Sequence, residues 1–326
     1  MCKILVTGAG GFIGSHLVDV LASNGHKIRA LVRYNSTNDI RNLKNISANT
    51  LSKIEIVFGD ITDSRFADHI VKGCDIVMHL AALIGIPYSY IAPISYTNVN
   101  IIGTLNILEA CRLHKTERMF HTSTSEVYGT ALYEPIDEAH PLQAQSPYSA
   151  SKIAADKLVQ SYYLSFELPI ITIRPFNTYG PRQSTRAVIP TIINQLLAHP
   201  EYLEIGSLEP KRDFTFVTDT AKGYLTALNT GGLDGETINL GTGYTISIGD
   251  IVETISGILN AKPEIRTVSS RIRPENSEVM LLISNNEKAK RLMSWMPKFN
   301  LEEGLINTVE YFRNNPIDPG INTYTV

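Results

Sequence analysis

The glycine-rich segment that follows the first apolar residues restricts the possible folds more than any other feature of this chain. Residues 3–7 read as a short strand, Gly8, Gly11 and Gly14 follow in a Gly-x-x-Gly-x-x-Gly spacing, and a helical pattern starts near residue 15. Glycines at this spacing permit a tight turn and let a pyrophosphate approach the backbone, while the helix N-terminus supplies unpaired N–H groups. Because the segment lies between a strand and a helix, it predicts a dinucleotide-binding turn.

Short apolar strands and helices alternate along the first half of the chain. Strands are expected at residues 27–32, 54–58, 76–80, 118–122 and 170–174, with helices at about 94–114 and from Pro147. This alternation predicts an α/β fold with a doubly wound parallel sheet of the Rossmann type. In such sheets ligands bind beyond the carboxyl ends of the strands. The candidate ligand-binding residues at these ends are Gly8, Asp60, Ala81, Ala82, Thr124 and Asn177.

The pattern loosens after Asn177, where prolines interrupt the chain and the expected helices are short. We place helices at about 191–198, 248–260 and 286–293, which indicates a smaller C-terminal α/β domain. The predicted organisation is a dinucleotide-binding domain at 1–176, to which a segment at about 213–242 returns, and a substrate domain at 177–326.

Composition argues against several classes of protein. Of the 326 residues, 43% are apolar and 19% are charged, as in ordinary globular enzymes, and the net charge of −3 does not suggest a broad nucleic-acid-binding face. The three cysteines are far apart and the histidines lack metal-ligand spacing, so we expect neither a disulfide framework nor a metal site. We expect no targeting segment and no membrane span, because the first strand begins at residue 3 and no apolar run is long enough. The expected location is the cytoplasm.

The candidate catalytic residues lie in two segments, 124–126 and 148–152. Positions i and i+4 of a helix share a face, so Tyr148 and Lys152 can stand side by side, and a neighbouring ammonium is expected to lower the pKa of the phenol. Such a tyrosine can accept a proton from a sugar or alcohol hydroxyl while hydride leaves the same carbon. Thr124 adds a hydroxyl and Glu126 a second base, which chemistry beyond simple oxidation requires.

Together these residues resemble the extended short-chain dehydrogenase/reductases that act on nucleotide sugars, and the resemblance covers nearly the whole chain. Within this family the chain is most similar to bacterial NDP-sugar 4,6-dehydratases of the legionaminic acid pathway. The motifs that carry the resemblance are Thr7-Gly8-x-x-Gly11-x-x-Gly14, Gly59-Asp60, His79-Leu80-Ala81-Ala82, Asn100-x-x-Gly103-Thr104, the segment 123–129, Tyr148-x-x-x-Lys152, the segment 174–182, Arg212-Asp213-Phe214 and Arg273-Pro274.

The resemblance implies a tightly bound NAD or NADP that is regenerated in every turnover. Asp60 would bind the adenine ring and Lys152 the nicotinamide ribose. Arg33 stands after the second strand, where the family usually has an acidic residue; an arginine there suits a 2′-phosphate, so NADP is an open alternative. The other implied cofactor contacts are Gly8, Gly11, Phe12, Ile13, Gly14, Ile61, Leu80, Ala81, Ala82, Asn100, Thr122, Tyr148 and Pro175.

The resemblance also implies a UDP- or GDP-linked sugar as the substrate. Asn177, Arg212 and Arg273 would hold its diphosphate, because the guanidinium fork forms charge-assisted hydrogen bonds with phosphate oxygens. The further implied substrate contacts are Thr124, Arg182, Ile84 and Tyr88 in a loop that would shape the hexose pocket, and Val188 and Ile189 beside the nucleoside.

The predicted reaction is dehydration of an NDP-hexose or NDP-N-acetylhexosamine to a 4-keto-6-deoxy sugar. Tyr148 would remove the O4 proton beside Thr124 while hydride passes from C4 to the nicotinamide. The ketone would acidify C5, Glu126 would remove the C5 proton, and the 6-hydroxyl would leave as water before hydride returns to C6 and a proton to C5. Ser125 stands where 4,6-dehydratases commonly have the aspartate that protonates this hydroxyl. The proton would therefore come from Glu126, or through Ser125 and water.

Three alternatives remain open. UDP-glucuronate decarboxylases share the Thr-Ser-Glu triplet of 124–126, and Arg182, Arg186 or Arg271 could face the substrate carboxylate. A nucleotide-sugar 4-epimerase would need only the tyrosine and the threonine, and would leave the glutamate idle. A non-catalytic NAD(P)-binding protein should tolerate loss of the tyrosine–lysine pair, so the intact pair argues against it.

A homodimer is expected through the helices near 94–114 and 147–166. The family often pairs these two helices with their copies in a four-helix bundle. Their apolar stripes are equally compatible with a buried core. The stripe residues are Ile101, Ile102, Leu105, Leu108, Leu113, Ile153, Ala154, Leu158, Tyr162 and Leu164.

Overall fold

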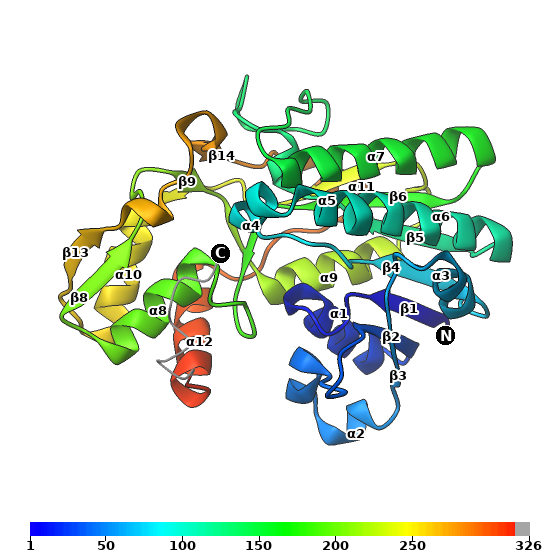
Figure 1. The fold of residues 1–326 in the computed structure, drawn as a ribbon, viewed down its shortest axis with the longest axis horizontal. Helices are drawn as coiled ribbons and strands as arrows, with labels where there is room; N and C mark the ends of the chain where they lie inside the picture. The colour runs from blue at the N-terminus through cyan, green and yellow to red at the C-terminus, as the bar shows by residue number, and fades with distance from the viewer. Residues whose placement is uncertain (317–326) are drawn as a thin grey trace.

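A seven-stranded parallel sheet forms the centre of the computed structural model, which describes residues 1–316 (Figure 1). The strand order is β11-β6-β5-β4-β1-β2-β3, and every neighbouring pair is parallel. The chain reverses its direction of winding between β1 and β4, where such sheets bind ligands. The predicted doubly wound α/β fold is therefore confirmed. The strands are β1 (Lys3–Thr7), β2 (Lys27–Arg33), β3 (Glu55–Gly59), β4 (Ile76–His79), β5 (Arg118–Thr122), β6 (Ile170–Pro175) and β11 (Thr237–Leu240).

Helices cover both faces of this sheet (Figure 1). One face packs against α1 (Phe12–Ser23), α9 (Val217–Leu228) and α11 (Glu287–Met293). The other face packs against α3 (Ser64–Val71), α6 (Gly103–His114) and α7 (Pro147–Phe166). Because both faces are covered, the strands read as nearly continuous apolar runs rather than as an alternation of apolar and polar residues.

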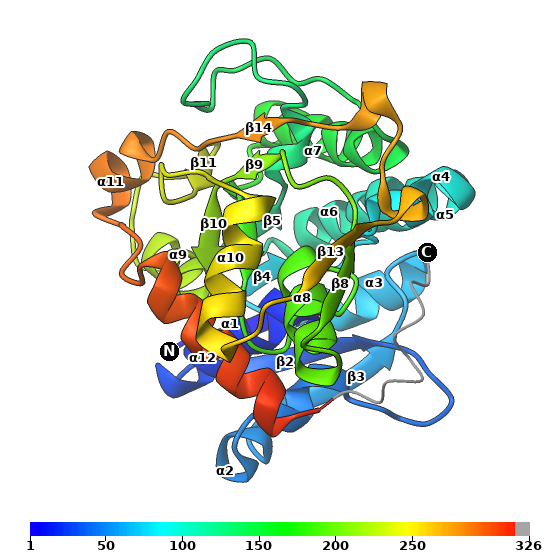
Figure 2. The same ribbon diagram turned by 90° about the vertical axis from the view of Figure 1, so that its left-hand side faces the viewer.

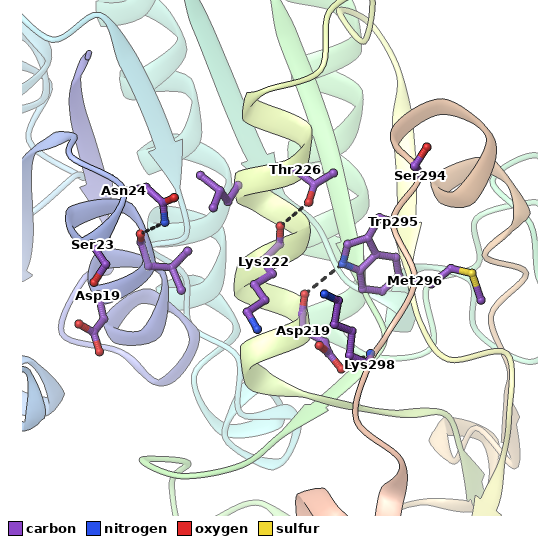
Figure 3. A pocket seen from close by; sticks show the side chains of 12 residues that line it. Asp19, Ser23, Asn24, Asp219, Lys222, Thr226, Ser294, Trp295, Met296 and Lys298 are labelled. Carbon is purple, nitrogen blue, oxygen red and sulfur yellow. Dashed lines mark hydrogen bonds between the residues drawn. The ribbon is translucent and has the colours of Figure 1, made fainter.

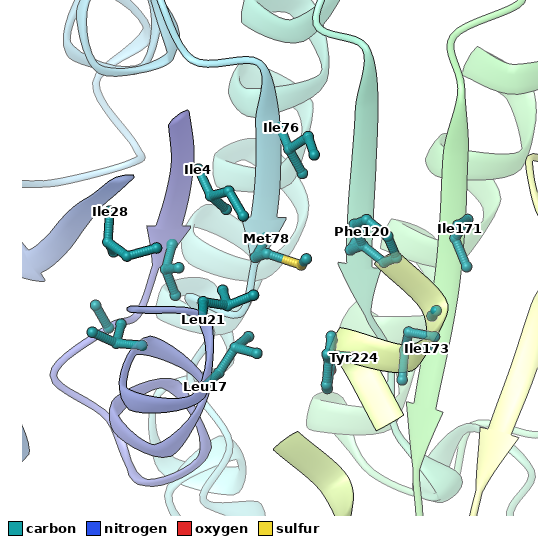
Figure 4. Packing of buried hydrophobic residues seen from close by; sticks show 14 of the residues in the cluster. Ile4, Leu17, Leu21, Ile28, Ile76, Met78, Phe120, Ile171, Ile173 and Tyr224 are labelled. Atoms are coloured by element: carbon teal, nitrogen blue, oxygen red, sulfur yellow. The ribbon is translucent and has the colours of Figure 1, made fainter. Parts of the chain in front are cut away.

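The first strand shows how one segment supplies two cores. Ile4 and Val6 point to the face of α1 and α9, whereas Leu5 points to the opposite face, and all three side chains are fully buried. Figure 4 shows the first of these cores, in which Leu17 of α1 and Tyr224 of α9 lie against side chains from the central strands. The sheet is thus held from both sides, and the carboxyl ends of its strands form a fixed edge.

A smaller group of helices and short strands lies beside this edge (Figure 2). Its core is formed by α8 (Val188–Ala198), α10 (Ile248–Leu259) and α12 (Leu301–Asn314). The domain limits at 176 and 177 stay a prediction, and residues 317–326 of the predicted second domain lie outside the described residues. The small sheets pair β7 (Asn177–Tyr179) with β10 (Phe214–Phe216), β8 (Tyr202–Ile205) with β13 (Glu264–Thr267), and β9 (Lys211–Arg212) with β12 (Ile246–Ser247) and β14 (Leu281–Leu282).

The structure departs from the expected elements in two places. The single helix expected at 94–114 consists of α5 (Pro93–Tyr96), a π-helical segment (Thr97–Ile102) and α6. The sequence predicts that the helix at 286–293 belongs to the second domain. In the structure, Ala289 and Met293 of α11 pack into the core of the large sheet. The remaining short elements are α2 (Ala48–Leu51), α4 (Ile86–Ile91) and five-residue or shorter 3-10 turns at Arg41–Asn45, Ser125–Val127, Ser269–Arg271 and Glu275–Ser277. Within residues 1–316, no helix combines the length and apolar character needed to cross a bilayer.

Candidate active site

The turn between β1 and α1 can be built only from glycine at two positions. Gly8 has a φ of +68°, and a Cβ atom on it would lie 2.9 Å from the amide N of Ala81. A Cβ atom on Gly14 would lie 2.2 Å from the carbonyl O of Gly8. Gly11 is the N-cap of α1 and offers no capping side chain, so the first N–H groups of the helix, at Phe12 and beyond, face outward without one. This turn suits a pyrophosphate.

Thr7 joins the glycine turn to the end of β4. Its Oγ1 accepts hydrogen bonds from the amide N of Leu80 at 3.1 Å and from that of Ala81 at 3.0 Å. The same oxygen lies 2.9 Å from Nδ1 of His79, whose pKa burial lowers well below its ordinary value. A neutral histidine and a threonine therefore fix the position of two predicted cofactor contacts, Leu80 and Ala81, against the glycine turn.

A small cavity of about 240 Å³ lies beyond the ends of β2 and β3. Its lining includes Arg33, Asp60, Thr62 and Tyr88. Oδ1 of Asp60 accepts hydrogen bonds from the amide N and the hydroxyl of Thr62, at 2.9 and 2.8 Å, which fixes the carboxylate in its turn. The structure thus brings two predicted cofactor residues, a cation and a carboxylate, to one cavity.

The start of α7 sets the position of Tyr148. Ser146 is the N-cap and forms a capping box with Ser149, so the helix begins just before the tyrosine. Tyr148 and Lys152, one turn later, are 6% and 4% exposed. Thr124, which follows β5, shares a hydrogen bond with the Tyr148 hydroxyl. The structure therefore brings together the threonine and the tyrosine that the sequence placed in one site.

The expected effect of Lys152 on Tyr148 is wrong for this structure. Burial raises the pKa of Tyr148 above its ordinary value; the Thr124 hydrogen bond opposes the rise, and the charge of Glu126 adds to it. The Nζ atom of Lys152 donates to the carbonyl O of Thr122 at 2.7 Å, which ties the helix to the end of β5. Burial also lowers the pKa of Lys152 itself, to about 8. Loss of solvation therefore outweighs the expected attraction between the ammonium and the phenolate.

Asn100 connects three elements instead of pointing freely into the crevice. Its Oδ1 accepts from the amide N of Leu83 at 2.8 Å, and its Nδ2 donates to the carbonyl O of Leu83 and to Oγ of Ser151, both at 2.9 Å. The loop after β4 is thereby fastened to α7. Tyr96 packs edge-on against Tyr148 with ring centroids 6.2 Å apart, which adds an apolar wall to the site.

Two of the three predicted diphosphate residues, Arg212 and Arg273, lie beside Glu278, which is not among the predicted residues. Nη2 of Arg212 donates to Oε1 of Glu278 at 2.9 Å, and Nη1 of Arg273 lies 3.5 Å from the same oxygen. Arg212 is buried, and burial lowers its pKa, whereas Glu126 raises it. Oδ1 of Asn177 is buried and has no hydrogen-bond partner among the described residues. The charge of Glu126 acts on both Tyr148 and Arg212, so this carboxylate lies between the two ends of the site.

Other predicted contacts have structural surroundings of their own. Nη2 of Arg182 donates to the carbonyl O of Asn45 at 3.2 Å and lies 3.8 Å from Asp19. This guanidinium therefore ties the segment after β7 to α1. Ser125 is buried at the end of β5, and Ile84 is exposed. The other predicted side chains are part of the packing. Ile13 and Leu80 are partly buried against the core between the sheet and α1, and Ile61 lies in the core between the sheet and α6. Val188 and Ile189 pack in the core formed by α8, α10 and α12, and Pro175 is buried in β6.

A second missed residue is Asp156, which accepts hydrogen bonds from His121, Ser123 and Arg174 below the tyrosine–lysine pair. Its position four residues after Lys152 was a usable signal, because an acidic residue on the buried face of a helix needs partners. Glu278 offered no comparable signal, since it lies in an irregular segment.

A cavity of about 610 Å³, larger than the one beside Arg33 and Asp60, lies elsewhere in the described residues (Figure 3). It is a groove between α1, α9 and the segment 294–298, and it contains none of the predicted site residues. Its volume therefore does not identify the site; the placement of the polar residues at the sheet edge does. Within residues 1–316, no group of three histidine, cysteine or acidic side chains is arranged to hold a metal ion.

Comparison with known proteins gives matches over nearly the whole chain. The family described as GDP-mannose 4,6 dehydratase matches residues 5–308. The dTDP-D-glucose 4,6-dehydratase of Homo sapiens is 31% identical over 320 residues, which are 96% of this chain and 90% of that protein. The UDP-glucuronic acid 4-epimerase of Bacillus cereus, solved with UDP-glucuronic acid and NAD, is similar with a TM-score of 0.88 and 30% identity, over 96% of this chain and 99% of that one. The dTDP-glucose 4,6-dehydratase of Streptomyces venezuelae, solved with NAD bound, gives a TM-score of 0.86 and 27% identity, over 96% and 97% of the two chains. The chain belongs to the extended short-chain dehydrogenase/reductase family of nucleotide-sugar dehydratases and epimerases.

Proposed function

We propose that this protein is a nucleotide-sugar 4,6-dehydratase, which converts an NDP-hexose or NDP-N-acetylhexosamine to its 4-keto-6-deoxy product. The observation that carries the proposal is the carboxylate of Glu126 beside the Thr124–Tyr148 pair, where its charge acts on Tyr148. Oxidation at C4 needs one base, whereas removal of water across C5 and C6 needs a second. A site with both bases suits the longer reaction.

NAD(P) fits the residues at the edge of the sheet. Gly8 and Gly14 leave no room for side chains, and the N-terminus of α1 carries no capping side chain, as a pyrophosphate requires. Arg33 and Asp60 would hold the adenosine, and Lys152 the nicotinamide ribose. When bound, the cofactor supplies a hydride acceptor at C4 and a hydride donor at C6. The two relatives named above that were solved with NAD support this assignment.

The residues of the chain carry the protons in this scheme. Tyr148 accepts the O4 proton while Thr124 orients its hydroxyl. The phenol must release its own proton before it can accept the one on O4. Because burial raises the pKa of Tyr148, this release depends on nearby positive charge. Glu126 accepts the C5 proton and delivers it to the departing 6-hydroxyl, since Ser125 is buried and a poor acid. Asn177, Arg212 and Arg273 would hold the diphosphate.

The 4-epimerase is the second candidate, because the Bacillus cereus relative with that activity is similar over almost the whole chain. An epimerase needs Tyr148 and Thr124 but makes no use of Glu126 as a base. A decarboxylase needs a cation facing a sugar carboxylate, and Arg182 is already held by Asn45 and Asp19. The position of Glu126 therefore favours the dehydratase over the epimerase, and the contacts of Arg182 count against the decarboxylase.

The test is incubation of the purified protein with a panel of UDP-, GDP- and dTDP-linked hexoses, N-acetylhexosamines and hexuronic acids. Mass spectrometry separates loss of water, loss of carbon dioxide, and an isomer of unchanged mass. We expect loss of water, and we expect Glu126→Gln to abolish it while Glu253→Gln, on the exposed side of α10, leaves it unchanged. Dehydration by Glu126→Gln at the wild-type rate would remove the proposed base.

The choice between NAD and NADP depends on Arg33. The side chain is exposed at the end of β2 and lines the small cavity with Asp60, where a 2′-phosphate would find a cation. Chromatography of the nucleotide released from denatured protein identifies the resident cofactor. An Arg33→Ala variant that loses NADP but keeps NAD would assign the cation to the 2′-phosphate.

We also propose a homodimer through α6 and α7. Leu113 and Leu164 are 67% and 70% exposed, and Phe166 and Ile102 are also exposed, which leaves apolar surface on both helices. Leu108 is excluded from such an interface because it is fully buried in the core of the sheet. Sedimentation at micromolar concentration should give a dimer, and Leu164→Glu a monomer. A wild-type monomer would contradict the proposal.

A further inference from the structure

Three residues on one face of α7 meet the end of β5 in order. Tyr148, Lys152 and Asp156 follow one another at intervals of four residues, and all three are buried. Lys152 donates to the carbonyl O of Thr122, and Asp156 accepts from Oγ of Ser123 at 2.7 Å. The helix therefore grips two consecutive residues of the strand end, immediately before Thr124.

Asp156 also collects two donors from the neighbouring strands. Nε2 of His121 in β5 lies 3.0 Å from Oδ1, and Nη2 of Arg174 in β6 donates to Oδ2 at 2.8 Å. Burial alone would raise the pKa of Asp156, but Arg174, His121 and Lys152 together lower it by more than burial raises it. The carboxylate is therefore ionised throughout the ordinary pH range. One buried negative charge thus joins α7, β5 and β6.

The network continues away from the site and ends in neutral groups. Nη1 of Arg174 donates to the hydroxyl of Tyr128 at 2.7 Å, and its guanidinium lies 4.7 Å above the same ring. The Tyr128 hydroxyl donates to Oδ1 of Asn239 in β11 at 2.8 Å. Because Arg174 also donates to Tyr128 and to Oγ of Ser123, the geometry around Asp156 is determined from several sides.

We propose that Asp156 is a positioning residue, which holds Ser123 and thereby places Thr124 against Tyr148 for the reaction. The inference rests on the proposed function only in taking Thr124 and Tyr148 as the groups that meet the sugar. Displacement of a reacting group by about 1 Å can cost about 100-fold in rate. Loss of Asp156 should therefore lower kcat more than it affects KM for the nucleotide sugar.

The first test compares Asp156→Asn with the wild-type holoenzyme. The amide keeps the shape of the side chain but replaces one of its two acceptor oxygens by an NH₂ group, so either His121 or the pair Ser123 and Arg174 loses its acceptor. We expect kcat to fall about 10- to 100-fold, with KM within about twofold of the wild type. Hydrogen–deuterium exchange of the peptide that contains 122–126 should become faster, and this second readout does not depend on which sugar reacts.

Two controls separate positioning from plain stability. Asp219 is equally buried, but it accepts from the backbone N of Lys298 and Phe299 in the distant groove. Asp219→Asn should lower the melting temperature while kcat stays within about twofold of the wild type. The double variant Asp156→Ala/Arg174→Met removes both buried charges; it should recover melting temperature relative to Asp156→Ala but not kcat.

Ser123→Ala keeps the test decisive if the aspartate variants do not fold, because it removes the link without burying an unpaired charge. We expect a severalfold loss in kcat and faster exchange at 122–126. The proposal is overturned if Ser123→Ala or Asp156→Asn turns over at the wild-type rate, or if the double variant recovers both stability and kcat. Failure of the wild-type protein to transform any nucleotide sugar would instead count against the proposed function, and the exchange measurement would still decide the role of Asp156.

Discussion

The two ends of the site are built differently. At the proposed sugar end, Tyr148 and Lys152 come from α7 and Thr124 from the segment that follows β5, and the large sheet and the buried carboxylate of Asp156 fix their positions. At the nucleotide end, Arg212 and Arg273 come from a two-residue strand and an irregular segment, and they share the single carboxylate of Glu278. The first end consists of buried groups with hydrogen-bond partners, whereas at the second the charges of Glu278 and Glu126 both act on Arg212.

This contrast matches the two tasks of the site. Proton transfer depends on atoms placed within fractions of an ångström, which favours groups on packed elements. Binding a diphosphate depends mainly on charge and hydrogen-bond number, which loops can supply. Changes at the sugar end should therefore act on kcat, and changes at the nucleotide end on KM.

The largest effect is expected for Tyr148→Phe. The variant keeps the ring that packs against Tyr96 but removes the hydroxyl that we propose accepts the O4 proton. Loss of a general base typically costs about 10²- to 10⁴-fold, so kcat should fall by that factor while KM changes little. Steady-state kinetics on the wild-type substrate checks this, with Tyr163→Phe on the same helix as the control. A Tyr148→Phe variant with normal kcat would show that another group takes the proton.

Arg212→Lys should act mainly on KM. Lysine keeps the charge but loses the fork that contacts two phosphate oxygens, and hydrogen bonds between charged groups contribute about 1.5–3 kcal/mol. We expect KM to rise by about 10- to 100-fold with kcat nearly unchanged. Arg266→Lys is the control, because Arg266 is exposed and paired with Glu264 in β13. An equal fall in kcat would mean that Arg212, on which the charge of Glu126 acts, also serves the chemistry, and it would contradict the division between the two ends.

The sequence predicts the sugar end better than the nucleotide end for a physical reason. The glycine turn, the β5 strand and the start of α7 are encoded locally, by turn residues, apolar runs and the capping serine Ser146. Their relative positions then follow from the parallel sheet. The role of Glu278 could not be predicted, because its partner Arg212 is 66 residues away in the sequence and the segment around Glu278 has no periodic pattern.

The raised pKa of Tyr148 shows what local reasoning omits. The spacing of Tyr148 and Lys152 is readable from the sequence, but the degree of burial and the competing acceptor at Thr122 depend on the packed fold. Desolvation then outweighs the charge of the lysine. The same limit applies to Asp156, whose donors come from strands that are distant in sequence.

The pH dependence of turnover should report on Lys152. Burial lowers its pKa to about 8, and Asp156 on α7 opposes this, while His79 and His121 face it from β4 and β5. The ammonium is present below about pH 8 and is lost as the pH rises through that value, so kcat should fall by up to tenfold per pH unit above it. Rates measured from about pH 6 to pH 10 test this, after incubation at each pH to exclude unfolding. A flat profile above pH 8 would remove the ammonium from the mechanism.

The smallest effect is expected for Glu278→Gln, and it tests whether the nucleotide end is balanced by its own carboxylate. The variant leaves the buried guanidinium of Arg212 without its charged partner, so the melting temperature should fall by a few degrees. A nucleoside diphosphate supplies new negative charge at the same place, so its addition should raise the melting temperature more in the variant than in the wild type. Glu264→Gln, which breaks an exposed ion pair with Arg266, should show neither change. If UDP, GDP and dTDP all stabilise the variant no more than the wild type, the arginines and the glutamate do not form the diphosphate site, and the contrast between the two ends has to be redrawn.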